Sequence, residues 1–178
     1  RWGGGGSTNL KQYKSKCLEP SAGPVLSGYD LVAYFSLESG ADGVQGSESY
    51  STTYGDHGNL YTFYFSTQAN LDLFDADPQK YLPAAGGFCS WGMAEEAWWH
   101  VSNMGPSVDP NVWTIIDGTL YFFMFNTPRD KFLGVLTDDS LDSSGSTAKY
   151  IDDATTRWAN MFDGKAAYNT ACFWWDAE

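Results

Sequence analysis

Residues 112–125, VWTIIDGTLYFFMF, place two β-prone runs on either side of an Asp-Gly pair. The runs 112–116 and 120–125 are rich in β-branched and aromatic residues, which are enriched in strands. Asp117 and Gly118 suit the two-residue turn of a hairpin, because both residue types tolerate a positive φ there. The stretch therefore predicts an antiparallel β-hairpin.

A second hairpin is predicted nearer the N-terminus. Residues 47–54 (SESYSTTY) and 60–65 (LYTFYF) are β-prone, and residues 55–59 (GDHGN) between them have turn chemistry. The segments around the two hairpins do not alternate strand and helix in the regular rhythm of a parallel α/β fold. This order favours an α+β fold with antiparallel pairing.

Helices are expected around the hairpins. A helix should begin near Thr67, which can cap it, and a shorter one is expected over residues 88–100. Residues 25–35 read as a turn that leads into one short helix. The strongest helical periodicity covers residues 148–162, and Gly164 is placed to end that helix. The expected fold is a single compact α+β domain with a small antiparallel sheet, short flanking helices and a C-terminal helix.

The chain of 178 residues fits one domain. Residues 1–19 are predicted to be a flexible basic N-terminal tail, because Gly3–Gly6 has the composition of a linker. Residues 20–178 then form the domain, with its C-terminal helix and a short tail.

Charge limits the partners. The net charge is −12, and four of the ten basic residues lie in the first sixteen positions, before any acidic residue. A field of this sign repels phosphate backbones, so nucleic acid is not an expected partner and cations are. No apolar run approaches the ~18 residues that span a bilayer, so no membrane insertion is expected.

The three cysteines predict one disulfide. Cys17 and Cys172 lie in terminal segments that have little else to hold them, so we expect them to pair and Cys89 to stay free. The alternative is three buried thiols in a reducing compartment. A disulfide would place the protein outside the cell or in the lumen of the secretory pathway or an organelle.

Several short motifs occur in a fixed order. They are Gly28–Phe35 (GYDLVAYF), Tyr61–Ser66 (YTFYFS), Phe74–Pro83 (FDADPQKYLP), Gly86–Cys89 (GGFC) and Trp113–Tyr121 (WTIIDGTLY). Their order resembles the YHS-domain family, in its longer form with a GYDxVAYF-like segment and a GG-aromatic-Cys motif. The resemblance spans about residues 25–162 and implies a compact α+β module, for which a metal-binding role has been inferred.

One part of the family pattern is missing. Short metal-associated YHS domains carry a Tyr-Phe-Cys-Ser-x-x-Cys-like segment with two thiols, whereas residues 64–70 here are YFSTQAN. The thiolate pair inferred for the family therefore does not carry over, although Tyr64 and Ser66 match other positions of the motif.

Four other side chains are candidate ligands of a transition metal such as copper or zinc: Cys89, His100, His57 and Met104. If residues 100–104 were helical, His100 and Met104 would share one face and offer a soft ion an imidazole and a thioether. The alternative reading is a buried core thiol and hydrogen-bonded histidines.

Aromatic density suggests a different kind of site. The chain holds eight Trp, eleven Tyr and eleven Phe, and residues 88–125 are especially rich in them. Six of these rings are candidates for the lining of a small-molecule pocket: Trp91, Trp98, Trp99, Trp113, Tyr121 and Phe123. The alternative is that the same rings only fill the core.

No catalytic arrangement is visible in the sequence, so we expect a binding module, and a thiol- or metal-dependent enzyme with Cys89 as its reactive group is an alternative. The expected ligand of the module is a transition metal ion, and the alternative ligand is a small molecule. A structural or assembly domain is the remaining alternative, in which the basic tail of one copy meets the acidic body of another and the protein self-associates.

Overall fold

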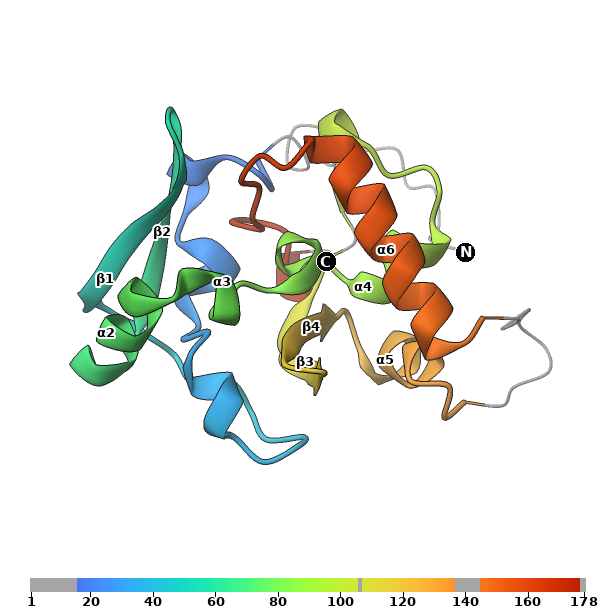
Figure 1. The fold of residues 1–178 in the computed structure, drawn as a ribbon, viewed down its shortest axis with the longest axis horizontal. Coiled ribbons are helices and arrows are strands. Elements are labelled where there is room, and N and C mark those ends of the chain that lie inside the picture. The colour runs from blue at the N-terminus through green and yellow to red at the C-terminus, as the bar shows by residue number, and fades with distance from the viewer. Residues whose placement is uncertain (1–15, 106, 137–144, 177–178) are drawn as a thin grey trace.

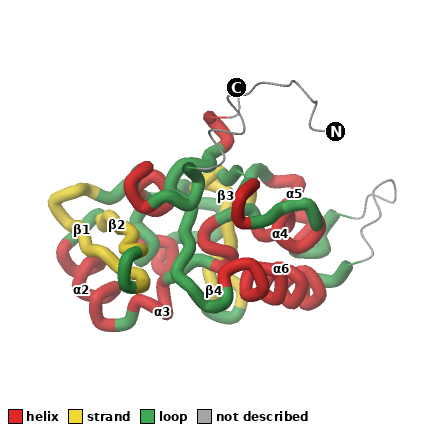
Figure 2. Tube along the Cα trace, turned by 90° about the horizontal axis from the view of Figure 1, so that it is seen from above, coloured by secondary structure: helices red, strands yellow, loops and turns green. Residues whose placement is uncertain are grey.

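A computed structural model describes residues 16–105, 107–136 and 145–176 of the chain. Its strands and α-helices are β1 (Ser47–Asp56), β2 (Asn59–Phe65), α2 (Gln68–Ala76), α3 (Pro78–Tyr81), α4 (Ser90–Glu95), β3 (Asp109–Ile116), β4 (Thr119–Phe123), α5 (Asn126–Phe132) and α6 (Thr147–Phe162). Short 3-10 turns are η1 (Pro20–Ala22), η2 (Val25–Gly28), η3 (Ala33–Ser36), η4 (Ala84–Gly87), η5 (Val101–Asn103) and η6 (Trp174–Asp176). The hairpin β3–β4 lies in the middle of the molecule (Figures 1 and 2). The hairpin β1–β2 and the helices α2 and α3 lie on one side of it, and the helices α4, α5 and α6 lie on the other.

Both predicted hairpins are present, and the α+β fold class is confirmed. They form two separate two-stranded antiparallel sheets, β1 with β2 and β3 with β4. Asp117 and Gly118 both adopt a positive φ, of 49° and 78°, as expected for a tight hairpin turn. The register of each hairpin shifts where a bulge interrupts β1 or β3.

Two predicted helices are confirmed, with their caps. The Thr67 side chain accepts a hydrogen bond from the Asn70 amide at the start of α2. In the same way the Ser146 side chain accepts from the Lys149 amide at the start of α6. At the other end of α6, Asp163 is left-handed and Gly164 follows with φ of 74°.

One helix prediction was wrong. The helix expected over residues 88–100 ends at Glu95, because the chain leaves helical geometry at Glu96 (φ −93°, ψ 85°). In the turn predicted before a short helix, Leu26 and Ser27 of η2 have positive φ, and the short helix that follows is the 3-10 helix η3. Helix α5 was not predicted, since residues 126–132 carry Pro128 and no clear apolar period.

The core is built from aromatic rings. Tyr34 meets Trp113 and Phe122 edge-on, with ring centroids 5.2 and 5.1 Å apart. Phe74 of α2 packs on the β1–β2 hairpin, with its ring centroid 5.0 Å from that of Phe63 and the two planes tilted by 33°. Helix α6 packs on α4 and completes the core on the other side. Many of the aromatic residues are therefore accounted for by packing.

Asp30 is fully buried, and its carboxylate joins two of the motifs that resemble the YHS family. Its Oδ1 accepts hydrogen bonds from the amides of Val32 and Ala33, at 2.9 and 3.1 Å. Its Oδ2 accepts from the Ser66 amide and hydroxyl and from the Asn70 side chain, at 2.7, 2.6 and 2.7 Å. Five donors offset the loss of hydration of a buried charge. These two motif residues, Asp30 and Ser66, are therefore explained by folding alone.

The Gly86-Gly87 pair of the fourth motif also has a structural reason. Gly86 and Gly87 adopt positive φ, of 58° and 82°. A Cβ at Gly86 would collide with the carbonyl oxygen of Ala167 and with the indole of Trp158 on α6. Only glycine fits between η4, α6 and the chain that follows α6.

The segment after α6 ties the two ends of the domain together. Asn169 is fully buried, and its side-chain amide donates to the carbonyl oxygens of Gly87 and Cys172. Its own backbone amide donates to the Gly86 carbonyl oxygen at 2.8 Å, and its carbonyl accepts from the Leu26 amide. The buried side chain thus links η4 to the C-terminal segment.

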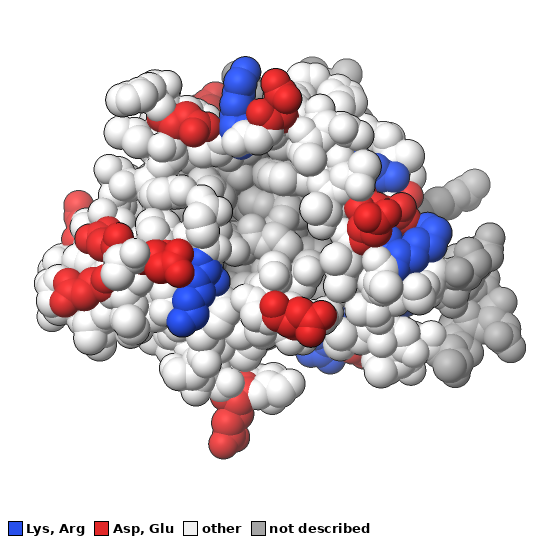
Figure 3. All heavy atoms as spheres, viewed as in Figure 1, with Lys and Arg blue, Asp and Glu red and all other residues white. Residues whose placement is uncertain are grey.

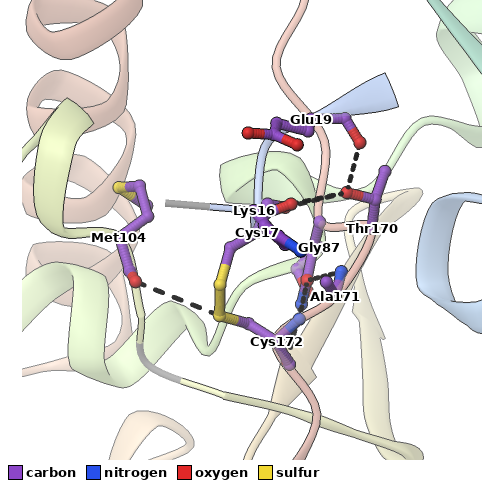
Figure 4. The surroundings of a disulfide bond; sticks show 9 residues. Lys16, Cys17, Glu19, Gly87, Met104, Thr170, Ala171 and Cys172 are labelled. Atoms are coloured by element: carbon purple, nitrogen blue, oxygen red, sulfur yellow. Dashed lines mark hydrogen bonds between the residues drawn. A yellow bond between two sulfur atoms is a disulfide. The ribbon is translucent and has the colours of Figure 1, made fainter. Parts of the chain in front are cut away.

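Thr170 does the same for the N-terminal residues (Figure 4). Its hydroxyl donates to the Glu19 carbonyl oxygen at 2.8 Å and lies 3.2 Å from the carbonyl oxygens of Lys16 and Cys17. Of the N-terminal tail predicted for residues 1–19, residues 1–15 lie outside the described residues. Residues 16–19 are part of the domain.

The predicted disulfide is present. Cys17 is bonded to Cys172, 155 residues later, with a Cα–Cα distance of 5.1 Å, and Cys89 is free (Figure 4). The bond lies beside the backbone of Met104, whose carbonyl oxygen is 3.9 Å from the Cys172 sulfur. It closes a long loop and fastens both terminal segments to the body of the domain.

Candidate functional site

Cys89 lies in the core, where only 2 % of its surface is exposed. Burial raises the pKa of its thiol to about 11, although nearby backbone amides, those of Gly92 and Met124 among them, act in the opposite direction. A thiol with this pKa is protonated at neutral pH and is a weak nucleophile and a weak metal ligand. The geometry therefore favours the reading of Cys89 as a small core residue.

The four candidate metal ligands are placed in different environments. Cys89 and Met104 are buried, whereas His57, in the turn between β1 and β2, and His100 are exposed. His100 Nδ1 lies 2.9 Å from the Ser102 hydroxyl oxygen. The expectation that His100 and Met104 share a helical face was wrong, because only Val101–Asn103 between them form a short 3-10 turn. Within the described ranges no three His, Cys, Asp or Glu residues are grouped to hold a metal ion.

The six candidate pocket rings are divided between the core and the surface. Trp113 is buried and donates its indole N–H to the Ala41 carbonyl oxygen at 2.8 Å. Tyr121 and Phe123 pack on Phe132, with centroids 5.4 and 5.2 Å away. These three rings are core residues.

The other three rings reach the surface. Trp91 is half-buried, and the Lys131 ammonium lies 4.8 Å from its ring centroid. Trp98 and Trp99 follow α4, with ring centroids 6.2 Å apart and planes at 45°. The Trp98 side chain is 61 % exposed, which makes it one of the most exposed large apolar residues in the described chain.

Contacts with Glu96 and with the backbone at Gly105 fix the neighbouring Trp99. Its indole N–H donates to the Glu96 carboxylate, which is three residues earlier in the chain. Its ring lies on the backbone at Gly105, where an added Cβ would be 2.8 Å from the ring. We call Trp98, Trp99 and the Glu95 and Glu96 carboxylates that precede them the tryptophan surface.

The tryptophan surface carries two carboxylates, and the His100 imidazole follows it in the chain. Glu95 and His100 are exposed, and Glu96 is half-buried. No Lys or Arg occurs in the sequence between Lys80 and Arg129. Aromatic rings with a few polar groups beside them are the kinds of side chain that line small-ligand sites.

A second pair of tryptophans is exposed near the disulfide. Trp174 and Trp175 have centroids 6.2 Å apart at 75°, and Trp175 stacks on the buried Phe173 at 4.9 Å. The Trp174 amide donates to the Val108 carbonyl oxygen. Among the described residues, these two side chains make ring contacts but no polar side-chain contact, so they offer a ligand fewer directed groups than the tryptophan surface does.

Sequence reasoning missed several residues that shape these features. Asn169 and Thr170 carry no periodic or motif signal, because their role depends on carbonyl groups more than 80 residues away. Glu96 adjoins another acidic residue, and nothing in its sequence neighbourhood indicates that it binds the Trp99 indole. Gly105, beneath the Trp99 ring, gave no signal at all.

The disulfide is consistent with an oxidising compartment, because such bonds persist where thiols are not kept reduced. A search of the described helices for one long and apolar enough to cross a membrane found none.

Comparisons with known proteins give no relative: no family model, no curated protein and no solved structure matches this chain.

Proposed function

We propose that this protein is a ligand-binding module of YHS-domain type, acting outside the cell or in a secretory or organelle lumen, that binds a small molecule on its tryptophan surface. The family resemblance supports the module type, and the disulfide supports the compartment.

One observation carries the proposal. Trp98 is 61 % exposed, although it adjoins Trp99, which is fixed by Glu96 and by the backbone at Gly105. Keeping a large apolar ring in water forgoes the stabilisation of burying it, ~2–3 kcal/mol for a large side chain. An exposed ring beside a fixed one is a ready platform for a ligand, since little conformational entropy is lost on binding.

The other hypotheses have less support from the geometry. An enzyme with Cys89 as its nucleophile would need a thiol with a lowered pKa, and burial raises it. A transition-metal site at Cys89, His100, His57 and Met104 is supported by the resemblance and the acidic charge alone. Metal analysis of untagged protein tests it, and copper or zinc at one equivalent per chain would restore it.

A neutral fluorescent dye tests the proposal without knowledge of the natural ligand. N-phenyl-1-naphthylamine gains fluorescence when it leaves water for an apolar surface. We expect it to bind the wild-type protein saturably, and we expect Trp98→Ala to weaken binding about fivefold or more, because half the platform is lost.

Trp174→Ala is the matched control, since it also removes an exposed indole. It should leave dye binding unchanged. The proposal is wrong if no saturable binding occurs, or if Trp98→Ala binds like the wild type while both variants unfold at the wild-type temperature.

A further inference from the structure

We propose that residues 1–15 of the chain bind the tryptophan surface of the same molecule, where they contact Trp98, Val101 and Glu95 and compete with the ligand. The competition rests on the proposed function, because it regulates access to the same surface. The contact itself does not depend on that function.

Residue 16, where the described chain begins, lies close to the tryptophan surface. The next residue, Cys17, is bonded to Cys172, whose sulfur lies 3.9 Å from the carbonyl oxygen of Met104 (Figure 4). Gly105 follows Met104 and lies against the ring of Trp99, because a Cβ added to it would be 2.8 Å from that ring. The segment 1–15 therefore joins the domain beside this surface.

The surface offers apolar area and negative charge together. Trp98 and Val101, three residues apart, are 61 % and 52 % exposed, and Glu95 is also exposed. Lys149 interacts electrostatically with Glu95, but its ammonium is hydrogen-bonded to Asp153. The partner that suits such a surface carries both apolar side chains and positive charges.

Residues 1–15 have that composition. Residues 10–14 are LKQYK, in which a leucine and a tyrosine are interleaved with two lysines. The segment holds three basic residues and no acidic one, whereas the whole chain has a net charge of −12. Figure 3 shows acidic side chains around the rim of one face. Opposite charge draws the segment to the body of the domain, and burial of apolar area against Trp98 and Val101 holds it there.

A short tether favours the segment of the same molecule over that of a second copy. An extended chain advances ~3.3 Å per residue, so residues 11–15 alone reach ~16 Å from residue 16. A segment tethered at such a distance has an effective concentration on the order of 1 mM at the surface. At micromolar protein concentration the segment of a second copy is roughly a thousandfold more dilute. Weak contacts are therefore sufficient to hold the segment on its own surface.

Charge reversal in the segment tests the competition in the full chain. Lys11→Glu/Lys14→Glu should release the segment and tighten the binding of N-phenyl-1-naphthylamine about threefold or more, because a larger fraction of the molecules then has the surface free. Lys80→Glu/Lys165→Glu is the matched control, since it reverses two exposed lysines of the body and changes the net charge equally. It should leave the affinity for this neutral dye unchanged.

A charge exchange identifies the partner of the two lysines. Glu95→Lys alone should also tighten dye binding, and Glu95→Lys combined with Lys11→Glu/Lys14→Glu should return it to the wild-type value, because opposite charges face each other again. An effect of net charge cannot produce this pattern, since the two changes move the net charge in opposite directions. Tighter binding in the combined variant than in either parent would contradict the contact between the segment and Glu95.

Fluorine NMR of protein labelled with 5-fluorotryptophan tests the contact without any ligand. Lys11→Glu/Lys14→Glu should shift the Trp98 resonance and leave that of the buried Trp113 in place, and Lys80→Glu/Lys165→Glu should shift neither. The wild-type Trp98 resonance should not change over a tenfold range of protein concentration. A resonance that moves with concentration would mean that a second copy supplies the segment, and would contradict binding within one molecule.

The outcomes separate the two proposals. An unshifted Trp98 resonance in Lys11→Glu/Lys14→Glu would overturn the contact, whether or not the dye binds. The expected shift in protein that binds no dye would keep the contact and overturn the small-molecule function. Saturable dye binding of equal strength in the wild type and in Lys11→Glu/Lys14→Glu would overturn the competition and leave the binding surface intact.

Discussion

The indole N–H of Trp99 donates a hydrogen bond to the carboxylate of Glu96, three residues earlier in the chain. This bond lies just beyond the end of α4, where the backbone has left helical geometry. It fixes one aromatic ring beside the exposed ring of Trp98 and keeps a negative charge at the edge of the pair. The interaction therefore shapes the proposed site in the segment that directly follows the end of α4.

The buried carboxylate of Asp30 should be among the most sensitive positions of the fold. We expect Asp30→Ala to lower the free energy of unfolding by about 3 kcal/mol or more, because it leaves several buried donors without an acceptor. Ser66→Ala should cost about 1–2 kcal/mol. Urea unfolding measures both, and Asp75→Asn, at an exposed position of α2, is the control with a change within about 0.5 kcal/mol. An Asp30→Ala protein as stable as that control would refute the structural role of Asp30.

Gly86 should tolerate no side chain. Gly86→Ala brings a Cβ against Ala167 and Trp158, whereas Gly118→Ala places one in open space at a similar positive φ of 78°. Placing a side chain on backbone with positive φ costs about 1 kcal/mol in both variants. Thermal unfolding should therefore show Gly86→Ala to be the less stable variant by about 2 kcal/mol or more. Equal stability of the two would mean that α6 does not pack on η4 as described.

Cys89 should make the stability of the protein depend on alkaline pH. The pKa of its thiol is raised from 9.0 to about 11 by burial, so ionisation favours the unfolded chain. The stabilisation is complete below about pH 9 and is lost as the pH rises through about 11, by up to about 3 kcal/mol. Cys89→Ala removes this component, so its stability should fall less than that of the wild type over the same interval. Parallel pH profiles of the two proteins in urea unfolding would contradict the burial of this thiol.

Loss of the disulfide should destabilise the protein without changing the fold. The bond closes a loop of 155 residues, so its removal should cost about 3–5 kcal/mol. Reductant should lower the urea midpoint of the wild type and leave that of the double variant Cys17→Ala/Cys172→Ala unchanged. Mass measurement without reductant should find one free thiol per chain, and three free thiols would exclude the pairing.

Local sequence signals predicted the regular elements well. Asp117-Gly118 between β-prone runs identified one hairpin, and the spacing of residues 148–162 identified α6 within one residue. Terminal segments without other means of attachment identified the disulfide partners. These signals are local or compositional, so they do not depend on how the elements pack.

The burial or exposure of individual side chains depends instead on long-range contacts. Trp98 and Trp113 are the same residue type in the same aromatic-rich region, yet one is 61 % and the other 6 % exposed. Their immediate sequences do not show which of the two is buried, because the burial of Trp113 requires Tyr34 and Ala41 from far earlier in the chain. Of the six rings proposed as a pocket lining, only Trp98 and Trp99 enter the proposed site, for this reason.

Fluorine NMR of protein labelled with 5-fluorotryptophan tests the binding surface most directly. Each of the eight tryptophans gives its own resonance, and single substitutions assign them. On titration with N-phenyl-1-naphthylamine we expect saturable shifts of the Trp98 and Trp99 resonances and an unchanged Trp113 resonance. Shifts confined to Trp174 and Trp175, or no shift at any resonance at dye saturation, would contradict the assignment of ligand binding to the tryptophan surface.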